Sequence, residues 1–178
     1  PKEDVRYAVL RDKWQANPPK AFFWFFLAQA VLVWLLMLPV YLITQQSSLS
    51  FHLLEWIGLS LWALALIGEG IADAQLARFK QTNTDPLGIC KAGLWRYSRH
   101  PNYFFQSLLW WALFLMALPA TWGWTAIIAP LAMLHFLLNV TGIPLTEKLS
   151  LQKRGDAFRH YQQTTSAFVP WFPKAPRD

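Results

Sequence analysis

The sequence has few charged residues and almost no cysteine. Only 15% of its 178 residues are Asp, Glu, Lys or Arg, whereas soluble domains have about 25%. A single cysteine, Cys90, excludes an intrachain disulfide and a cysteine-rich metal centre. The four histidines are scattered, and His135 with Asn139 is an incomplete ligand set, so no metal site is expected. What is plentiful is apolar: 54% of the residues are hydrophobic and 16% are aromatic.

The net charge of +6 does not indicate nucleic-acid binding. Nucleic-acid-binding proteins carry their basic residues as a patch or stripe, whereas here they flank apolar runs. Attraction to anionic lipid headgroups explains this arrangement more simply. We therefore expect membrane lipids as partners, and no nucleic acid.

Four apolar segments each approach the ~20 residues that cross a bilayer as a helix. Pro119 and Gly123 lie in the short turn between the last two, which predicts a helical hairpin. The expected fold is all-α: a polytopic membrane helix bundle with four transmembrane helices, forming one domain over residues 1–178. The four segments span residues 22–44, 53–75, 103–118 and 122–143.

The basic residues predict the orientation of these segments. All sixteen Lys and Arg occur before the first segment, in the loop 76–102, or in the tail 144–178, and none occurs in residues 45–52 or 119–123. Cytoplasmic connections carry the excess of Lys and Arg, so both termini are expected in the cytoplasm. The tail is expected to form a cytoplasmic amphipathic helix.

Polar side chains inside the membrane segments are candidates for a cavity lining. Ionisable groups in the membrane are costly and usually face a cavity or a partner. Glu69 and Asp73 are spaced i and i+4 on one helix, as are His135 and Asn139 on another. Hydrogen bonding between helices is the alternative role for such residues. The candidates for a substrate cavity are Gln29, Glu69, Gln106, His135 and Asn139.

The densest polar cluster is Gly93-Leu-Trp-Arg-Tyr-Ser-Arg-His-Pro-Asn-Tyr103, directly before the third segment. Arginine binds phosphate through two hydrogen bonds, and a helix that begins near Asn102 offers free backbone N–H groups to an anion. These residues predict a phosphate or carboxylate pocket at the cytoplasmic membrane surface. A solvated topogenic loop is the alternative.

This cluster and the ending Thr165-Ser-Ala-Phe-Val-Pro-Trp-Phe-Pro173 resemble the bacterial DUF1295 proteins of the steroid 5α-reductase superfamily. That superfamily includes sterol reductases and isoprenylcysteine carboxyl methyltransferases. The likeness covers nearly the whole chain, but its Arg-His-Pro-Asn-Tyr core does not separate reductase from methyltransferase. It implies an integral protein of the bacterial inner membrane.

Among the reductases, the resemblance implies NADPH-dependent reduction of a polarised carbon–carbon double bond in a steroid-like or isoprenoid enone lipid. Asp73 and Lys80 match positions on the adenosine side of the cofactor. Asn102 and Tyr103 match positions beside the nicotinamide and diphosphate, and Tyr161 matches a tyrosine that closes over the cofactor. The full set implied as cofactor-binding is Asp73, Lys80, Arg96, Arg99, His100, Asn102, Tyr103, Arg154 and Tyr161.

Two departures from the family pattern keep other functions open. The family continues after Asn-Tyr with an apolar residue, Gly, then Glu or Asp, whereas this chain has Phe104, Phe105 and Gln106. Relatives also have further helices before the Glu3-Asp4-x-Arg6-Tyr7 motif, where the steroid reductases hold their proton donor, so no catalytic residue is assigned. The alternatives are a methyltransferase that uses S-adenosylmethionine and a non-catalytic subunit associated with other membrane chains.

Overall fold

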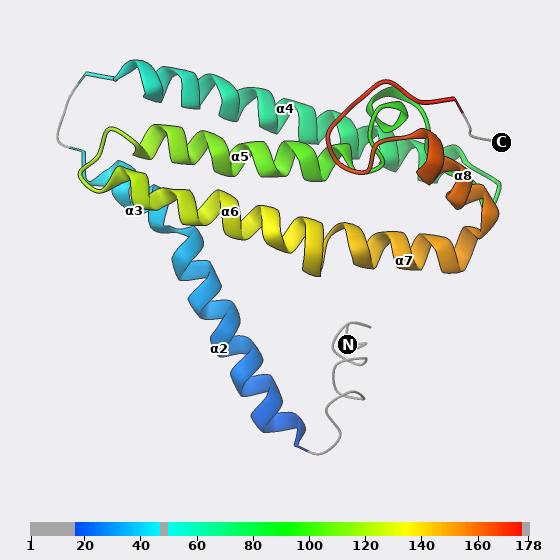
Figure 1. The fold of residues 1–178 in the computed structure, drawn as a ribbon, viewed down its shortest axis with the longest axis horizontal. Helices are drawn as coiled ribbons and strands as arrows, with labels where there is room; N and C mark the ends of the chain where they lie inside the picture. The colour runs from blue at the N-terminus through cyan, green and yellow to red at the C-terminus, as the bar shows by residue number, and fades with distance from the viewer. Residues whose placement is uncertain (1–16, 47–49, 176–178) are drawn as a thin grey trace. The chain divides into compact units, whose positions relative to one another are not determined.

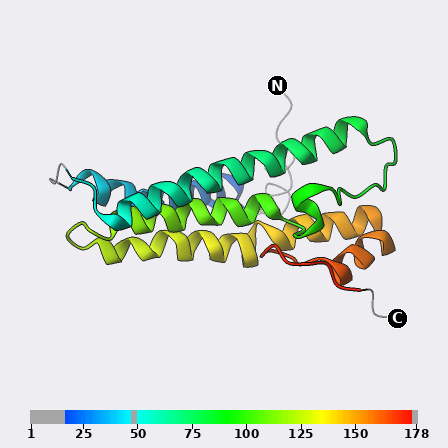
Figure 2. The same ribbon diagram turned by 90° about the horizontal axis from the view of Figure 1, so that it is seen from above.

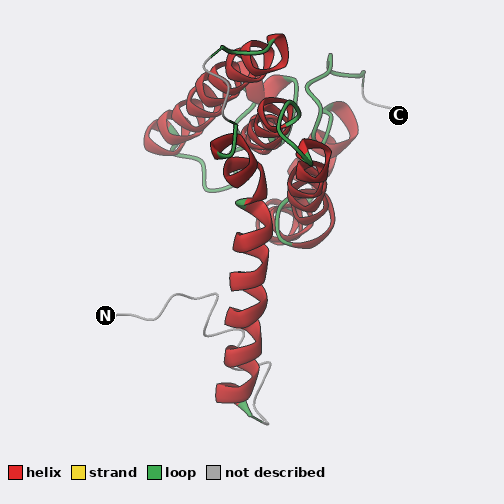
Figure 3. Ribbon diagram, turned by 90° about the vertical axis from the view of Figure 1, so that its left-hand side faces the viewer, coloured by secondary structure: helices red, strands yellow, loops and turns green. Residues whose placement is uncertain are grey.

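The computed structural model describes residues 17–46 and 50–175, which form helices and loops (Figures 1 and 3). Within these ranges there is no β-strand, only an isolated bridge between Ser98 and Ser166. The chain divides into two compact units, residues 1–37 and 38–178. The all-helical prediction is confirmed for the described residues.

The described part of the first unit is one apolar helix, α2 (Pro18–Leu36). The Asn17 side chain caps it by accepting a hydrogen bond from the backbone N–H of Lys20 at 3.3 Å. The helix ends at Met37, two residues before Pro39. Proline lacks an N–H, and its ring clashes with the carbonyl four residues earlier. The predicted continuous helix over 22–44 is therefore interrupted, and α3 (Leu38–Thr44) begins the second unit.

The long helix α4 (Leu53–Thr82) packs against α5 (Pro101–Ala117), which runs antiparallel to it (Figures 1 and 2). Small residues on α4 allow this close approach. A Cβ added at Gly58 would lie 2.5 Å from the side chain of Met116, and one at Gly68 would lie 2.4 Å from the ring of Phe105. The predicted second segment ended at residue 75, but the helix continues for two more turns.

A tight turn joins α5 to the next helical run, as the predicted hairpin requires. A Cβ at Gly123 would lie 2.1 Å from the carbonyl oxygen of Ala117, so only glycine fits there. The predicted segment 122–143 is helical over almost its whole length, but it consists of three pieces and has a break at Gly142. These pieces are a 3-10 turn (Gly123–Ile127), α6 (Ile128–His135) and a π turn (Phe136–Val140).

Beyond Gly142 the chain forms α7 (Ile143–Arg154) and α8 (Asp156–Thr164). Helix α8 is amphipathic, because Phe158 and Tyr161 are buried while Arg159 and His160 are exposed. Residues 165–175 then return along the loop before α5, and the backbone N–H of Arg99 donates to the Ser166 carbonyl at 2.8 Å.

Three helical runs are long and apolar enough to cross a membrane: Pro19–Thr44, Leu53–Thr82 and Gly123–Arg154. Large apolar side chains along them are exposed, including Trp62 and Ile67 on α4. An exposed apolar surface of this extent suits contact with lipid. The apolar helices therefore indicate a membrane protein. The described residues contain three candidate spans, whereas the sequence predicted four.

Candidate functional site

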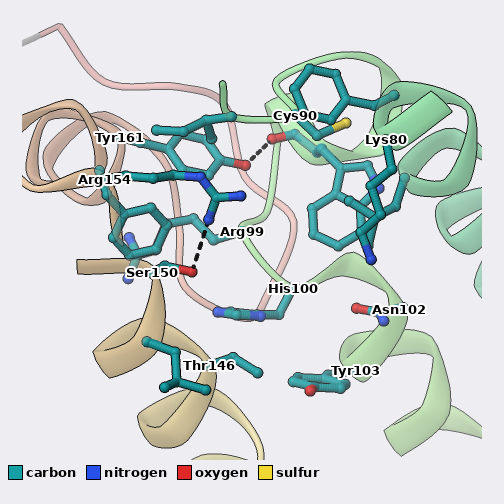
Figure 4. Close-up of a pocket in the computed structure, with 16 residues that line it drawn as sticks. Lys80, Cys90, Arg99, His100, Asn102, Tyr103, Thr146, Ser150, Arg154 and Tyr161 are labelled. Atoms are coloured by element: carbon teal, nitrogen blue, oxygen red, sulfur yellow. Dashed lines mark hydrogen bonds between the residues drawn. The ribbon is translucent and has the colours of Figure 1, made fainter. Parts of the chain in front are cut away.

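A cavity of about 330 Å³ opens where α4, the loop 89–100, α5, α7 and α8 meet (Figure 4). Trp95, Phe79 and Phe158 supply much of its apolar lining. The polar lining residues come from all five of these segments. They are Lys80, Cys90, Arg99, His100, Asn102, Tyr103, Thr146, Ser150, Arg154 and Tyr161.

The loop before α5 is held against α4 by two hydrogen bonds. Gln75 accepts from the backbone N–H of Leu94 at 2.9 Å, and the Trp95 indole donates to the Ala72 carbonyl at 2.9 Å. Gly93 allows this arrangement, because its φ of +58° suits glycine and a Cβ there would lie 2.3 Å from the Gln75 side chain. Gly93 is thus required by the backbone conformation of the loop and does not line the cavity.

Arg99 fixes three parts of the site together. Its Nε donates to Glu147 Oε1 at 2.7 Å, and its Nη1 donates to the carbonyls of Gln162 and Thr165. Gln162 also donates to Glu147, through Nε2 to Oε2 at 2.8 Å. Arg99 and Glu147 are largely buried, and most of the donors of this guanidinium are already used. Its main role is therefore to hold the loop, α7 and the tail together.

His100 and Tyr103 form one flat wall at the start of α5. Their rings stack with centroids 5.3 Å apart and 7° between planes. His100 Nε2 lies 3.3 Å from Glu147 Oε1, which fixes the imidazole from the other side. Pro101 occupies the first helical position, where a missing N–H carries no cost. The wall presents an aromatic pair beside the open N–H groups of a helix N-terminus.

Asn102 has an unsatisfied polar atom. Its Nδ2 donates to Asp73 Oδ1 at 3.1 Å, which orients the amide. Its Oδ1 is buried and has no hydrogen-bond partner among the described residues. A buried acceptor without a partner costs about 1–3 kcal/mol. Asn102 also lines the cavity, so this unsatisfied amide lies beside the space that a ligand would occupy.

Lys80 and Arg154 bring positive charge to the cavity from α4 and α7 (Figure 4). Arg154 is oriented by two hydrogen bonds, from Nε to the Gly88 carbonyl at 3.0 Å and from Nη1 to Ser150 Oγ at 3.3 Å. Within the described chain, Lys80 has no ion-pair partner, and its side chain is exposed. A fixed guanidinium and a free ammonium are well suited to phosphate oxygens.

Tyr161 closes the cavity from α8 and is almost fully buried. Its hydroxyl donates to the Trp95 carbonyl, and Lys91 lies over the ring with Nζ 5.5 Å from the centroid. Burial raises the pKa of this phenol far above its usual value and also raises the pKa of the neighbouring Cys90 thiol. Both groups are therefore neutral at pH 7 and add no negative charge to the site.

The structure brings together most of the predicted cofactor residues. Asp73 reaches the site only through Asn102, and Arg96 is exposed outside it. Seven line the cavity: Lys80, Arg99, His100, Asn102, Tyr103, Arg154 and Tyr161.

The predicted substrate-cavity residues lie elsewhere. Gln29 is exposed on α2, in the other unit. His135 and Asn139 contact each other at 3.5 Å on an exposed face. Neither Glu69 nor Gln106 lines this cavity. Phe105, the departure from the family glycine, packs on Gly68 and also stays outside the lining.

Sequence reasoning missed Glu147 and Gln75, which position the motif. It also missed the lining residues Cys90, Thr146 and Ser150. Glu147 is the one acidic residue between Asp85 and Asp156, and this isolation in a basic tail was the available signal. Within the described ranges, no group of three or more His, Cys, Asp or Glu side chains could hold a metal ion.

The fold and the basic aromatic cavity place the chain among helical membrane proteins with a site at one end of the bundle. The chain belongs to the DUF1295 family, a steroid 5α-reductase-like family whose model is described as a protein of unknown function and matches residues 1–165. It is 28% identical to an uncharacterized protein of Schizosaccharomyces pombe over 193 residues. That match covers 94% of this chain and 55% of the relative, so the chain spans about half of the relative's length. No solved structure matches it.

Proposed function

We propose that the cavity binds NADPH and that the chain is the cofactor-binding part, or the whole, of a membrane reductase acting on an enone-like lipid. The observation that carries the proposal is the combination of the unpartnered Asn102 Oδ1 with the cations of Lys80 and Arg154 in one cavity. A dinucleotide phosphate has both kinds of group, a carboxamide N–H₂ that donates and phosphates that accept. The volume of about 330 Å³ is near the lower end of ligand pockets and suits enclosure of part of such a molecule.

In this proposal, residues on each side of the cavity bind a different part of the cofactor. Asn102 accepts from the carboxamide, while Asp73 prevents the amide from turning away. The stacked rings of His100 and Tyr103 provide a flat apolar surface for an aromatic ring. Lys80 supplies the compact charge for a 2′-phosphate, and Arg154 the second cation. Arg99 acts indirectly, because its hydrogen bond to Glu147 keeps the loop in place.

When bound, NADPH supplies a hydride to the electron-poor carbon of a polarised double bond, and a proton completes the neighbouring carbon. The chain's own residues bind, orient and exclude water, and the proton donor is not assigned to any of them. Neutral Tyr161 and Cys90 leave the cavity positive, which favours the anionic cofactor.

The proposal includes four membrane crossings. Helix α5 has 17 residues, or about 25 Å at 1.5 Å per residue, slightly less than the ~30 Å hydrocarbon core. It lies between α4 and α6 (Figures 1 and 2), where a short helix is shielded from lipid by its neighbours. With the basic connections on one side, both termini, the tail helix and the cavity face the cytoplasm, in a bacterial inner membrane.

The experiment is thermal unfolding of the detergent-purified chain with NADPH, NADH or S-adenosylmethionine. A ligand at a hundred times its dissociation constant adds about 2.7 kcal/mol of stability. We expect NADPH to raise the Tm, NADH to act more weakly, and both Lys80→Ala and Asn102→Ala to lose the NADPH shift. Lys153→Ala is the matched control, because Lys153 precedes Arg154 but does not line the cavity.

The other outcomes identify the competing functions. A shift with S-adenosylmethionine alone would indicate the methyltransferase, since that cofactor offers a carboxylate and no phosphate. No shift with any of the three, from a chain that unfolds cooperatively, would overturn the cofactor proposal and favour the non-catalytic subunit. A lipid-like enone substrate is screened only after NADPH binding is established.

A further inference from the structure

The tail after α8 carries a row of large apolar side chains on its outer side. Val169, Trp171 and Phe172 are 52%, 65% and 75% exposed. They lie in the non-helical residues 168–174, which follow the cavity-lining part of the chain and do not line the cavity themselves. A cluster of this kind on a folded surface marks a binding face.

The backbone of this segment is held in place by three hydrogen bonds. Ser98 Oγ donates to the Phe168 carbonyl at 2.8 Å, the Trp171 N–H donates to the Tyr97 carbonyl at 2.9 Å, and the Lys174 N–H donates to the Thr164 carbonyl at 2.8 Å. The exposed row is therefore anchored by its backbone to the loop before α5 and to α8.

The segment lies at the level where α5 begins. Phe168 packs edge-on against Phe104, in the first turn of α5, with ring centroids 5.7 Å apart. Phe172 packs against Tyr97, just before α5, at 6.0 Å. The row is thus level with the end of the apolar bundle, where Trp and other aromatic residues concentrate in membrane proteins.

The charges beside the row have one sign. Residues 86–100 and 157–175 contain no Asp or Glu. Lys91 and Arg96 line an open depression of about 420 Å³ next to Pro173, and Lys174 follows. Exposed aromatic residues flanked by cations that have no ion-pair partner among the described residues match the surface of a bilayer that contains anionic lipids.

We propose that residues 168–174 dock into the interface of an anionic bilayer, with Trp171 and Phe172 inserted and Lys91, Arg96 and Lys174 on the headgroups. The residues just before this segment hold the site, because Arg99 donates to the carbonyls of Thr165 and Ser166. The docked tail therefore fixes the Arg99 wall of the cavity. This inference does not depend on which cofactor the cavity binds.

The test uses a spin label on the full chain in lipid nanodiscs. The label is placed by Phe172→Cys in a Cys90→Ala background, and its collision rates with oxygen and with a water-soluble nickel chelate are compared. Trp62→Cys on the exposed side of α4 is the reference for lipid, and Arg159→Cys on α8 is the reference for water. We expect the Phe172 label to have an oxygen-to-nickel ratio between the two references.

A change of lipid composition tests separately whether the aromatic side chains insert and whether anionic headgroups attract the cations. Addition of phosphatidylglycerol to phosphatidylcholine should raise the ratio at Phe172, and replacement of Lys91, Arg96 and Lys174 by Gln should remove that rise. A ratio equal to that at Arg159 in both lipids would overturn the docking and leave the row for a protein partner. Insertion that is insensitive to phosphatidylglycerol would overturn the role of anionic lipid.

Discussion

The carboxylate of Glu147 and the guanidinium of Arg99 lie 2.7 Å apart, although they are 48 positions apart in the chain. Glu147 comes from α7, and Arg99 from the loop before α5. The same carboxylate contacts His100 and Gln162, so it joins the motif, α7 and α8. The pair therefore connects the cavity-lining residue Arg99 to the two helices that complete the site.

We predict that Glu147→Ala strongly destabilises the fold. The Arg99 charge would be left in a largely buried position, and loss of one partner of a buried pair costs about 3–5 kcal/mol. Glu147→Gln keeps hydrogen-bonding capacity and should cost less. Thermal unfolding in detergent measures both, and a double variant with Arg99→Ala should be much less than additive. Additive effects would show that the pair is not coupled.

Gly68 and Phe105 give a second prediction, because the Phe105 ring occupies the space of a Gly68 side chain. Gly68→Ala should cost about 1–3 kcal/mol through overpacking, and Phe105→Leu in the same chain should recover part of the loss. Gly70→Ala is the control on the same helix, since a Cβ there meets nothing within 4 Å. It should be neutral or stabilising by about 0.5–1 kcal/mol. Equal loss in both alanine variants would argue against the packing.

The Gly68–Phe105 contact shows where the sequence was insufficient. The family glycine that Phe105 replaces lies directly beyond the Asn102-Tyr103 motif, and the linear sequence does not show whether such a side chain faces a ligand or another helix. In the structure α4 provides a glycine, Gly68, and α5 provides the ring of Phe105 that fills the space beside it. The departure therefore concerns helix packing, and the cavity wall formed by His100, Asn102 and Tyr103 lies on another side.

Helix type and approximate bounds were accessible from apolar runs, since crossing segments need a fixed length. The breaks at Met37 and Gly142 were not, because they depend on local backbone geometry around Pro39 and after the π turn. Clustering of the motif residues could be anticipated from their adjacency. The partner Glu147 could not be, because its pairing with Arg99 depends on how α7 folds back.

Tyr161 gives a pH-dependent prediction. Its phenol pKa is raised by burial, so the folded chain keeps the proton when the unfolded chain loses it, at a pH near 10. The stabilisation is therefore complete below pH 10 and is lost as the pH rises above it. Tyr161→Phe should lack this alkaline loss and should cost about 1–3 kcal/mol at neutral pH, because the Trp95 carbonyl loses its donor. Unfolding curves from pH 7 to 11 measure both. Parallel pH profiles for the two proteins would contradict the prediction.

Cys90 is a natural reporter of the cavity, because it is the chain's single cysteine, lines the cavity and is only 5% exposed. Burial raises its thiol pKa, which reduces the reactive thiolate at neutral pH. We expect slow alkylation by N-ethylmaleimide at pH 7.5, with a rate that still increases above pH 9.

The exposed thiol of Phe172→Cys in a Cys90→Ala background is the comparison for Cys90. Bound NADPH should slow the Cys90 reaction further and leave the Phe172→Cys reaction unchanged. Alkylation of Cys90 as fast as the exposed thiol would contradict its burial. Slow alkylation that NADPH does not alter would agree with the burial of Cys90 but would place the cofactor outside this cavity.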